Sequence, residues 1–335
     1  MVQLQSKLVD SFGRIGRKLR ISITDRCNMR CIYCMPNGNT EWFDQYKILS
    51  YHEIVKLVTI LAKLGIEKVR VTGGEPLVRP KVEDLIKPLS NIDEIKSISM
   101  TTNGLLLKDK VMQLRDAGLS SINFSLDTFN EERFKAITGI RGLTKVKNAI
   151  RAADDAGLKI KINTVIMRGW NDDEIVDFAQ FARFTGYTVR FIEFMPLDGS
   201  GIWEPNLVVT KNETINRINK DVGKLVPVGN TNNSEPAMLY SFNDGIGTLG
   251  FIPSISEPFC GNCDRLRISS DGRLMTCLYE NPGYDLRNML RGKKSDKEIT
   301  EYILESVKKK PEGIIKIIRT KSLKPNLNLM HRIGG

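Results

Sequence analysis

Apolar segments of strand length alternate with longer amphipathic segments over residues 18–194. The amphipathic segments place apolar residues three and four positions apart, as at Ile54, Leu57 and Leu61, which would share one face of a helix. Strands that alternate with helices at this spacing pair in parallel, and each helix crosses over the sheet. The sequence therefore predicts an α/β fold built on a parallel sheet.

Strand–helix units of this kind recur along the first two-thirds of the chain. The predicted strands cover residues 18–23, 68–72, 95–101, 121–126, 159–165 and 188–194. The predicted helices cover the segment after Ser50 and residues 82–89, 108–117, 131–137, 145–156 and 173–185. A closed TIM barrel needs eight such units, so we predict a partial, open, TIM-like (β/α)6 barrel. In such barrels the chemistry gathers at the C-terminal ends of the strands.

Three cysteines, Cys27, Cys31 and Cys34, follow the first predicted strand in the spacing C-x3-C-x2-C. Disulfides between residues this close are geometrically awkward, and a structural zinc site normally has four ligands. A conventional 4Fe–4S cluster also takes four cysteines, so a cluster held by this loop would leave one iron open to a cofactor or substrate. We therefore predict an iron–sulfur cluster here rather than buried or disulfide-bonded cysteines.

The other predicted barrel strands end in polar or glycine-bearing segments. These segments are residues 73–76, 101–104, 125–127 and 193–196, and Asn163 lies in the fifth strand. Each of them alone could be an ordinary turn. Because parallel strands bring their carboxyl ends to one mouth of the barrel, these ends together with the cysteine loop predict one site.

The composition changes after a linker at residues 197–237, which is rich in Gly, Asn and Pro. We expect a barrel domain at residues 1–235 and an α+β region at residues 236–335 that binds a second cluster. Short strands near 239–242 and 247–252 precede a second cysteine set, and helices near 286–290 and 296–308 follow it.

The second set consists of Cys260, Cys263 and Cys277, again without a fourth cysteine nearby. A zinc site completed by His or water is the alternative to a second 4Fe–4S cluster, but no His lies close in sequence. Arg265 and Arg267 lie between these cysteines and would share one face of a strand. Such a pair could grip phosphate oxygens beside the cluster or form an ordinary solvated strand. We expect both cysteine sets to face one cavity.

The net charge of +11 in 335 residues fits either a nucleotide substrate or a nucleic acid. No aromatic-rich RNA-binding motif is present, which argues against nucleic acid. With only His52 and His331 in the chain, imidazole acid–base chemistry is not the expected centrepiece. Cysteines clustered as metal ligands favour a reducing cytoplasm. No apolar run is long enough to span a membrane, so we expect no membrane partner.

The C-x3-C-x2-C loop resembles that of the radical S-adenosylmethionine (SAM) superfamily. Four features taken together narrow the resemblance: this loop, the Gly-Gly-Glu-Pro turn at 73–76, a C-x2-C-x13-C set that brackets R-x-R, and a terminal Gly-Gly. From about residue 15 to the end, the chain is similar to the GTP 3′,8-cyclase family of molybdenum cofactor biosynthesis, the MoaA family. Small departures are Met29, where an aromatic residue is common, and Asp264, where we expect Asn.

The resemblance implies a role for individual residues. It implies two 4Fe–4S clusters, held by Cys27, Cys31 and Cys34, and by Cys260, Cys263 and Cys277. SAM would bind the open iron of the first cluster and contact Tyr33, Gly74, Ser125, Met195 and Asn163. GTP would be held by Arg20, Arg70, Thr101, Lys161, Arg265, Leu266 and Arg267, with its guanine at the second cluster. The tail residues Gly334 and Gly335 would enter the active site.

The implied reaction is the conversion of GTP to 3′,8-cyclo-7,8-dihydroguanosine 5′-triphosphate, the first step of molybdopterin biosynthesis. The implied partners are GTP, SAM, an external electron donor and a downstream cyclic pyranopterin monophosphate synthase, and a homodimer is left open. Three alternatives compete with this prediction: another two-cluster radical SAM enzyme that modifies peptides or RNA, an RNA-binding protein, and a two-cluster electron carrier without catalysis.

Overall fold

Twelve strands form one mixed sheet in the order β12-β11-β10-β1-β2-β3-β4-β5-β6-β9-β8-β7. The computed structural model describes residues 7–35, 41–197, 201–229, 235–280, 282–314 and 330–334. Consecutive strands from β1 to β6 all pair in parallel. The predicted α/β fold with a partial barrel of six strand–helix units is therefore confirmed.

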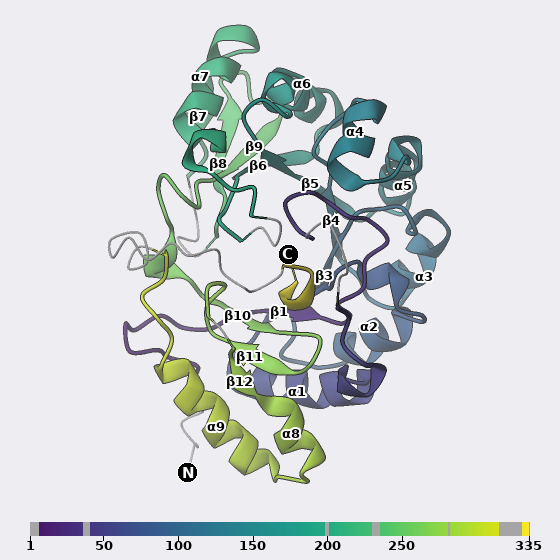
Figure 1. The fold of residues 1–335 in the computed structure, drawn as a ribbon, viewed down its shortest axis with the longest axis vertical. Helices are drawn as coiled ribbons and strands as arrows, with labels where there is room; N and C mark the ends of the chain where they lie inside the picture. The colour runs from purple at the N-terminus through teal and green to yellow at the C-terminus, as the bar shows by residue number, and fades with distance from the viewer. Residues whose placement is uncertain are drawn as a thin grey trace.

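The elements of the barrel lie close to their predicted positions. Its strands are β1 (Lys18–Ser22), β2 (Lys68–Thr72), β3 (Ser97–Thr102), β4 (Ser121–Ser125), β5 (Lys159–Ile166) and β6 (Thr188–Glu193). Its helices are α1 (Tyr51–Lys63), α2 (Glu83–Ser90), α3 (Val111–Asp116), α4 (Glu131–Thr138), α5 (Leu143–Asp155) and α6 (Ile175–Thr185). They lie outside the curved row of strands (Figure 1).

The C-terminal part of the chain extends both ends of this row. β9 (Thr248–Ile252) pairs in parallel with β6, and β10 (Arg265–Ile268) pairs in parallel with β1. The edges are antiparallel: β8 (Met238–Phe242) and β7 (Leu225–Pro227) follow β9, while β11 (Arg273–Met275) and β12 (Tyr284–Asp285) follow β10. Both predicted regions thus share one sheet, and the boundary at residue 235 stays a prediction.

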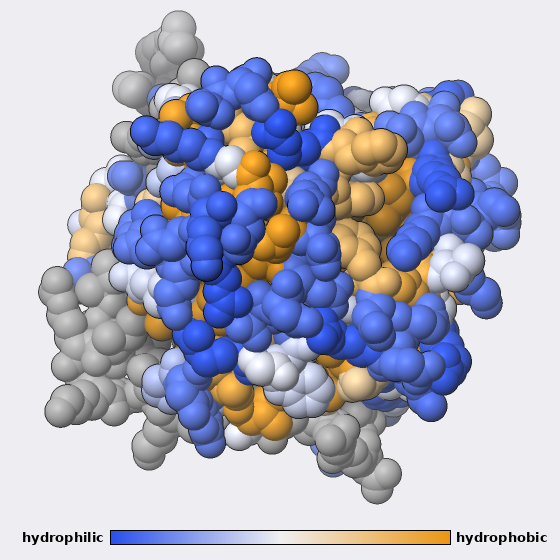
Figure 2. All heavy atoms as spheres, turned by 90° about the horizontal axis from the view of Figure 1, so that it is seen from above, coloured by the Kyte–Doolittle hydropathy of each residue, from blue (hydrophilic) through white to orange (hydrophobic). Residues whose placement is uncertain are grey.

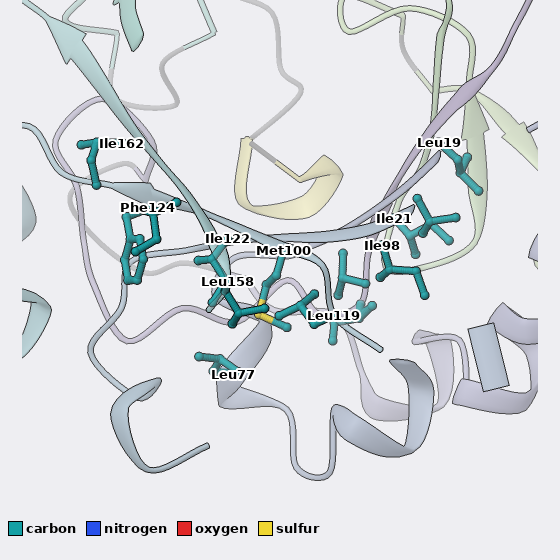
Figure 3. Packing of buried hydrophobic residues seen from close by; sticks show 14 of the residues in the cluster. Leu19, Ile21, Leu77, Ile98, Met100, Leu119, Ile122, Phe124, Leu158 and Ile162 are labelled. Atoms are coloured by element: carbon teal, nitrogen blue, oxygen red, sulfur yellow. The ribbon is translucent and has the colours of Figure 1, made fainter. Parts of the chain in front are cut away.

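The hydrophobic core lies between the barrel strands and their helices. Leu19 and Ile21 of β1 are each 1% exposed, and Arg20 between them points to the other face because successive strand residues alternate. Figure 3 shows Met100, Ile122 and other apolar side chains of the strands packed on the side of the helices. The inner face of the barrel is therefore left to the polar residues of each strand.

Helix starts follow their local sequence signals. Ser50 caps α1: its Oγ accepts from the Glu53 backbone N at 3.2 Å, and the Glu53 carboxylate accepts from the Ser50 N at 2.7 Å. The same capping box starts α7 (Lys211–Asp221) at Thr210 and α9 (Asp296–Lys308) at Ser295. Such caps satisfy backbone donors that a helix start leaves without partners.

The last helices pack against the first. Arg291, at the end of α8 (Leu286–Arg291), donates from Nε to the Glu53 carboxylate at 2.7 Å, and the Lys56 ammonium lies 3.2 Å from Asp296. The short α11 (Met330–Ile333) lies at the centre of the molecule in Figure 1. Hydrophilic side chains cover most of the face in Figure 2. Among the described residues, no helix has the length and apolar character that a membrane span requires.

Candidate active site

A cavity of about 250 Å³ lies inside the barrel at the C-terminal ends of the strands. Most of the predicted site residues line it: Arg20, Cys27, Cys31, Tyr33, Cys34, Arg70, Gly74, Thr101, Ser125, Asn163, Met195, Arg265 and Arg267. The other described ones, Lys161, Cys260, Cys263, Leu266, Cys277 and Gly334, lie outside the lining. Gly335 lies outside the described residues.

The first cysteine loop crosses the mouth of the barrel and is anchored to the end of α4. The backbone N of Arg30 donates to the Thr138 carbonyl at 2.8 Å, and that of Ile32 donates to the Ile137 carbonyl at 2.9 Å. All three cysteines of the loop are free and half-buried. Burial raises the pKa of Cys27 to about 11 and that of Cys34 to about 12. Bound iron would supply the nearby positive charge that stabilises these cysteines as thiolates.

Tyr33 in this loop is held by a buried carboxylate. The Tyr33 hydroxyl donates to Asp127 Oδ2 at 2.5 Å, and the Val165 backbone N donates to Asp127 Oδ1 at 2.8 Å. Burial raises the pKa of Asp127 to about 6, although the two hydrogen bonds oppose that rise. Asp127 therefore ties the cysteine loop to the ends of β4 and β5.

The turn after β2 presses its backbone against the cysteine loop. A Cβ added at Gly74 would lie 2.4 Å from the Arg26 carbonyl oxygen, so only glycine fits there. Next to it, Glu75 is buried and accepts from Thr102 Oγ1 and from the Asn103 N, both at 2.7 Å. Burial raises the pKa of Glu75 to about 7. This turn leaves polar groups and a close backbone surface beside the three cysteines.

The cavity wall opposite the helices carries a row of arginines. The strand register pairs Arg20 with Arg267 of β10 on one side and with Arg70 of β2 on the other. Burial, followed by repulsion from neighbouring arginines, lowers the pKa of Arg267 to about 10, and burial and repulsion from Arg190 do the same for Arg70. Within the described ranges, no carboxylate forms a salt bridge with these arginines. A polyanionic ligand would relieve this repulsion.

Unpaired polar atoms mark the cavity as a ligand site. The buried Thr101 Oγ1, Asn163 Oδ1, Arg190 Nε and Arg265 Nε have no hydrogen-bond partner among the described residues. Buried polar atoms are rarely left without partners in folded proteins. Lys161 lies close enough to Arg190 and Arg70 that they, after burial, lower its pKa to about 8.

The second cysteine set lies behind one wall of the cavity. The Cys263 N donates to the Cys260 carbonyl at 3.2 Å, and neighbouring residues Phe259 and Leu278 line the cavity. Burial alone would raise the pKa of Cys263, but the cations of Arg265 and Lys310 hold it at about 7. The first cysteine set lines the cavity, but of the second set only chain neighbours do, so the expectation that both sets face one cavity stays a prediction.

The donor sets fit iron–sulfur clusters better than single metal ions. Among the described residues, no three His, Cys, Asp or Glu side chains converge as the ligands of one ion would. In a cluster each thiolate binds a different iron, so the ligands are spread further apart. Beside the second set, the buried Tyr279 hydroxyl has no hydrogen-bond partner within the part of the chain that the structure describes. Such a donor suits a sulfur acceptor of a bound cluster.

The C-terminal tail closes the cavity. The Arg332 Nη2 donates to the Glu41 carbonyl at 2.6 Å, and the Arg332 carbonyl accepts from the Ser270 N at 3.3 Å. The Gly334 carbonyl accepts from Arg267 Nη1. Gly334 has a φ of 80° and lies so close to β2 that an added Cβ would be 2.0 Å from Thr72 Oγ1. This backbone conformation and contact would strain any residue other than glycine at this position.

Some cavity residues were missed in the sequence. They are Glu75, Asp127, Arg190, Phe259 and His331, of which Glu75 and Asp127 were noted only as parts of strand ends. Arg190 had a usable signal, because it interrupts the apolar residues Val189, Phe191 and Ile192 of its strand. His331 had none: it is 1% exposed and packs edge-on against Trp42 with ring centroids 5.6 Å apart, far away in sequence.

Comparisons with known proteins agree with this geometry. Residues 21–182 match the Radical SAM superfamily, and residues 187–315 match Molybdenum Cofactor Synthesis C. The GTP 3′,8-cyclase of Thermodesulfovibrio yellowstonii is 44% identical over 97% of this chain and 99% of that protein. The GTP 3′,8-cyclase of Rhodopirellula baltica is 41% identical over 98% of this chain and 92% of that protein. The chain belongs to the GTP 3′,8-cyclase family. The predicted resemblance is therefore confirmed.

Solved structures support the fold of this GTP 3′,8-cyclase family member. Streptococcus suis SuiB bound to the precursor peptide SuiA superposes with a TM-score of 0.61 at 16% identity, over 89% of this chain and 65% of SuiB. SuiB bound to S-adenosylmethionine gives a TM-score of 0.57 at 16% identity, over 80% of this chain and 62% of SuiB. At such low identity the likeness concerns the fold alone. The radical SAM family implies a 4Fe–4S cluster and SAM for this chain.

Proposed function

We propose that the chain converts GTP to 3′,8-cyclo-7,8-dihydroguanosine 5′-triphosphate, using SAM and two 4Fe–4S clusters. One observation carries the proposal. A single cavity brings the free cysteines Cys27, Cys31 and Cys34 together with the arginine row of Arg20, Arg70 and Arg267. A cofactor loop and an anion site in one chamber suit radical chemistry on a nucleoside triphosphate.

The first cysteine loop would hold the first cluster, and SAM would lie beside it. When bound, the cluster and SAM would supply radical chemistry that can remove the ribose 3′ hydrogen, which is not acidic enough for a side-chain base. The chain contributes position and exclusion of water. Asp127 fixes Tyr33, Gly74 permits close approach of the backbone, and Ser125, Asn163 and Met195 line the same wall.

The arginine row would hold the triphosphate. Arg20, Arg70 and Arg267 lie in register on adjacent strands, and arginine forks match phosphate oxygens with two hydrogen bonds each. Arg190 and Lys161 add charge to the same region. Fixing the triphosphate would place the ribose toward the first cysteine loop, and a fixed geometry of this kind lowers the entropic cost of the reaction.

The second cysteine set would hold the other cluster near the guanine base. Phe259 and Leu278 form the cavity wall there, and the Arg265 guanidinium lies 4.6 Å from the centroid of the Phe259 ring. The tail would keep water out, because α11 and Gly334 cover the chamber between Thr72 and Arg267.

The proposal extends to partners. An external electron donor must supply the electron that SAM cleavage consumes. The product would pass to a cyclic pyranopterin monophosphate synthase. We expect the protein to work in the reducing cytoplasm that thiolate-bound clusters require.

Anaerobic reconstitution followed by turnover tests the proposal. The protein is incubated with SAM, a strong reductant and either GTP, a peptide or RNA, and both 5′-deoxyadenosine and the nucleotide product are quantified. We expect product only when GTP is the substrate offered with SAM and the reductant. Arg20→Gln removes a charge-assisted contact worth about 1.5–3 kcal/mol, so it should lower the rate of product formation at least tenfold. Lys96→Gln, on the surface, is the control. Modification of peptide or RNA without GTP turnover would overturn the proposal, as would clusters that never cleave SAM.

A further inference from the structure

The residues before β1 fold back as a small hairpin. Val9 and Ile15 form an antiparallel bridge, and the Gly16 N donates to the Leu8 carbonyl at 2.7 Å. The hairpin carries Arg14, which is only 7% exposed. Asp10 on the same hairpin accepts from Arg14 Nε at 2.6 Å. A buried guanidinium on a terminal hairpin is costly, so its contacts with the rest of the chain indicate a role.

Arg14 reaches segments that are hundreds of residues away. Its Nη1 donates to the carbonyls of Cys260 at 2.9 Å and Glu312 at 3.1 Å, and its Nη2 donates to the carbonyl of Pro311 at 2.7 Å. A single side chain thus joins the N-terminal hairpin, the start of the second cysteine loop and the segment after α9.

Lys310 holds the other end of the same loop. It is 4% exposed, and its ammonium donates to the carbonyls of Cys263 at 2.8 Å and Arg265 at 3.1 Å. Like Arg14, it donates to the carbonyl of a cysteine. Two buried cations therefore lie behind the loop, and Arg14 forms a salt bridge with Asp10.

We infer that Arg14 and Lys310 form a two-cation clamp that positions the second cysteine set and tunes the iron–sulfur centre it would hold. This inference rests on the proposed second cluster. Neutral hydrogen-bond donors could hold two carbonyls at lower desolvation cost. A 4Fe–4S core with three thiolates, in contrast, is a net anion that becomes more negative on reduction. Buried cations behind the loop stabilise the reduced state more than the oxidised one.

Matched variants of the full-length chain, reconstituted anaerobically, distinguish an effect of the buried charges from an effect of side-chain packing. Lys310→Met removes the charge and keeps most of the length, and Lys309→Met makes the same change at an exposed neighbour. We expect Lys310→Met to lower the midpoint potential of the second centre in an EPR redox titration and to alter its EPR spectrum. Lys309→Met should change neither, and the first centre should keep its potential in both.

Arg14→Gln should lower the iron content, because the loop loses the contact at the Cys260 carbonyl and with it the connection to the carbonyls of Pro311 and Glu312. We expect about eight irons per wild-type chain, a loss of up to half of them in Arg14→Gln, and no loss in Arg17→Gln at an exposed position. SAM cleavage without GTP reports the first centre and should continue. Arg14→Lys keeps the charge, so the second clusters that assemble in this variant should have the wild-type midpoint potential.

Two outcomes overturn the inference and differ from each other. If the wild type itself binds about four irons, the proposed second cluster fails and the clamp fails with it. If the wild type binds about eight but Lys310→Met matches Lys309→Met in potential and spectrum, the clamp alone is wrong. If Arg14→Gln does not fold, the Lys310 pair still decides.

Discussion

At the scale of single residues, the cavity concentrates charges that its surroundings disfavour. Burial lowers the pKa of arginines in the wall, and burial with repulsion from Arg190 and Arg70 lowers the pKa of Lys161 to about 8. On the opposite side, burial raises the pKa of Asp127 to about 6. Because of these shifts, Asp127 and Lys161 change protonation state near pH 6 and pH 8, where the protein can be studied.

Lys161 gives GTP binding a predicted pH dependence. As the pH rises through about 8, Lys161 of the free protein loses its proton, and a bound triphosphate must then recover it. We therefore expect the dissociation constant of GTP to increase above pH 8 by up to about tenfold per pH unit. Calorimetry in buffers of different ionisation enthalpy would measure this proton uptake.

Lys161→Met should weaken GTP binding at pH 7 and should make the dissociation constant of GTP less dependent on pH above 8. Lys159→Met, at an exposed position of the same strand, should keep the wild-type slope. An unchanged slope in Lys161→Met would exclude Lys161 as the group responsible.

The pair of Tyr33 and Asp127 gives a predicted loss of stability in Tyr33→Phe. Removing the hydroxyl leaves a buried carboxylate without one of its donors, which costs about 1–3 kcal/mol of unfolding free energy. Because burial raises the pKa of Asp127 to about 6, the carboxylate is mostly neutral at pH 5 and charged at pH 8. The penalty in urea unfolding of the metal-free chain should thus be larger at pH 8. Tyr46→Phe, 70% exposed, is the control, and equal penalties at both pH values would contradict this account.

At the scale of elements, the C-terminal helix α11 and Gly334 complete the chamber. They contact the residues that follow β1 and the ends of β2 and β10, which are separated by most of the chain. Gly334 adopts a left-handed conformation directly against Thr72, so the tail position depends on the absence of a side chain.

Gly334→Ala should therefore impair turnover rather than folding. A left-handed alanine costs roughly 1–2 kcal/mol, and the contact with Thr72 adds to it, so we expect at least about a tenfold loss of product formation. Gly157→Ala has a similar φ of 73° but no neighbour within 4 Å, and it should keep full activity. Product and 5′-deoxyadenosine should be measured together. Full activity of Gly334→Ala would show that the tail position does not matter.

At the scale of the whole molecule, the C-terminal region adds strands to both open edges of the partial barrel. Its strands β9 and β10 extend the two ends of the parallel row. This arrangement brings Arg265 and Arg267 to the cavity and places the second cysteine set behind its wall. Chain neighbours of the second set therefore line the same cavity as the first set, although the two sets are far apart in sequence.

Removing each cysteine set should separate two activities. Replacing Cys27, Cys31 and Cys34 by Ala should abolish SAM cleavage and leave about four irons. Replacing Cys260, Cys263 and Cys277 by Ala should also leave about four irons, yet SAM cleavage should continue while cyclised nucleotide disappears. Iron analysis and product assays check both. Loss of SAM cleavage in the second variant would show that the two centres are not independent.

Much of the fold and part of the site could be predicted from local patterns. The helix after Ser50, the strand at residues 18–23 and the spacing of Cys27, Cys31 and Cys34 depend on neighbours within a few residues, and the helix and the strand lie where they were predicted. Arg190 was overlooked although it interrupts an apolar strand, and the role of Asp127 was overlooked because a polar residue after such a strand has no local partner to reveal it.

The sequence by itself determined the strand–helix units, the alternation of buried residues along β1, and two sets of three cysteines whose spacing predicts metal ligands. These features follow from periodicity and residue type, which are properties of short segments. Only the tertiary structure decided that Arg267, Arg20 and Arg70 lie in one row, that Arg14 reaches Cys260, and that Gly334 rests on Thr72. These contacts join residues far apart along the chain, and their geometry is set by strand order and packing of the whole sheet.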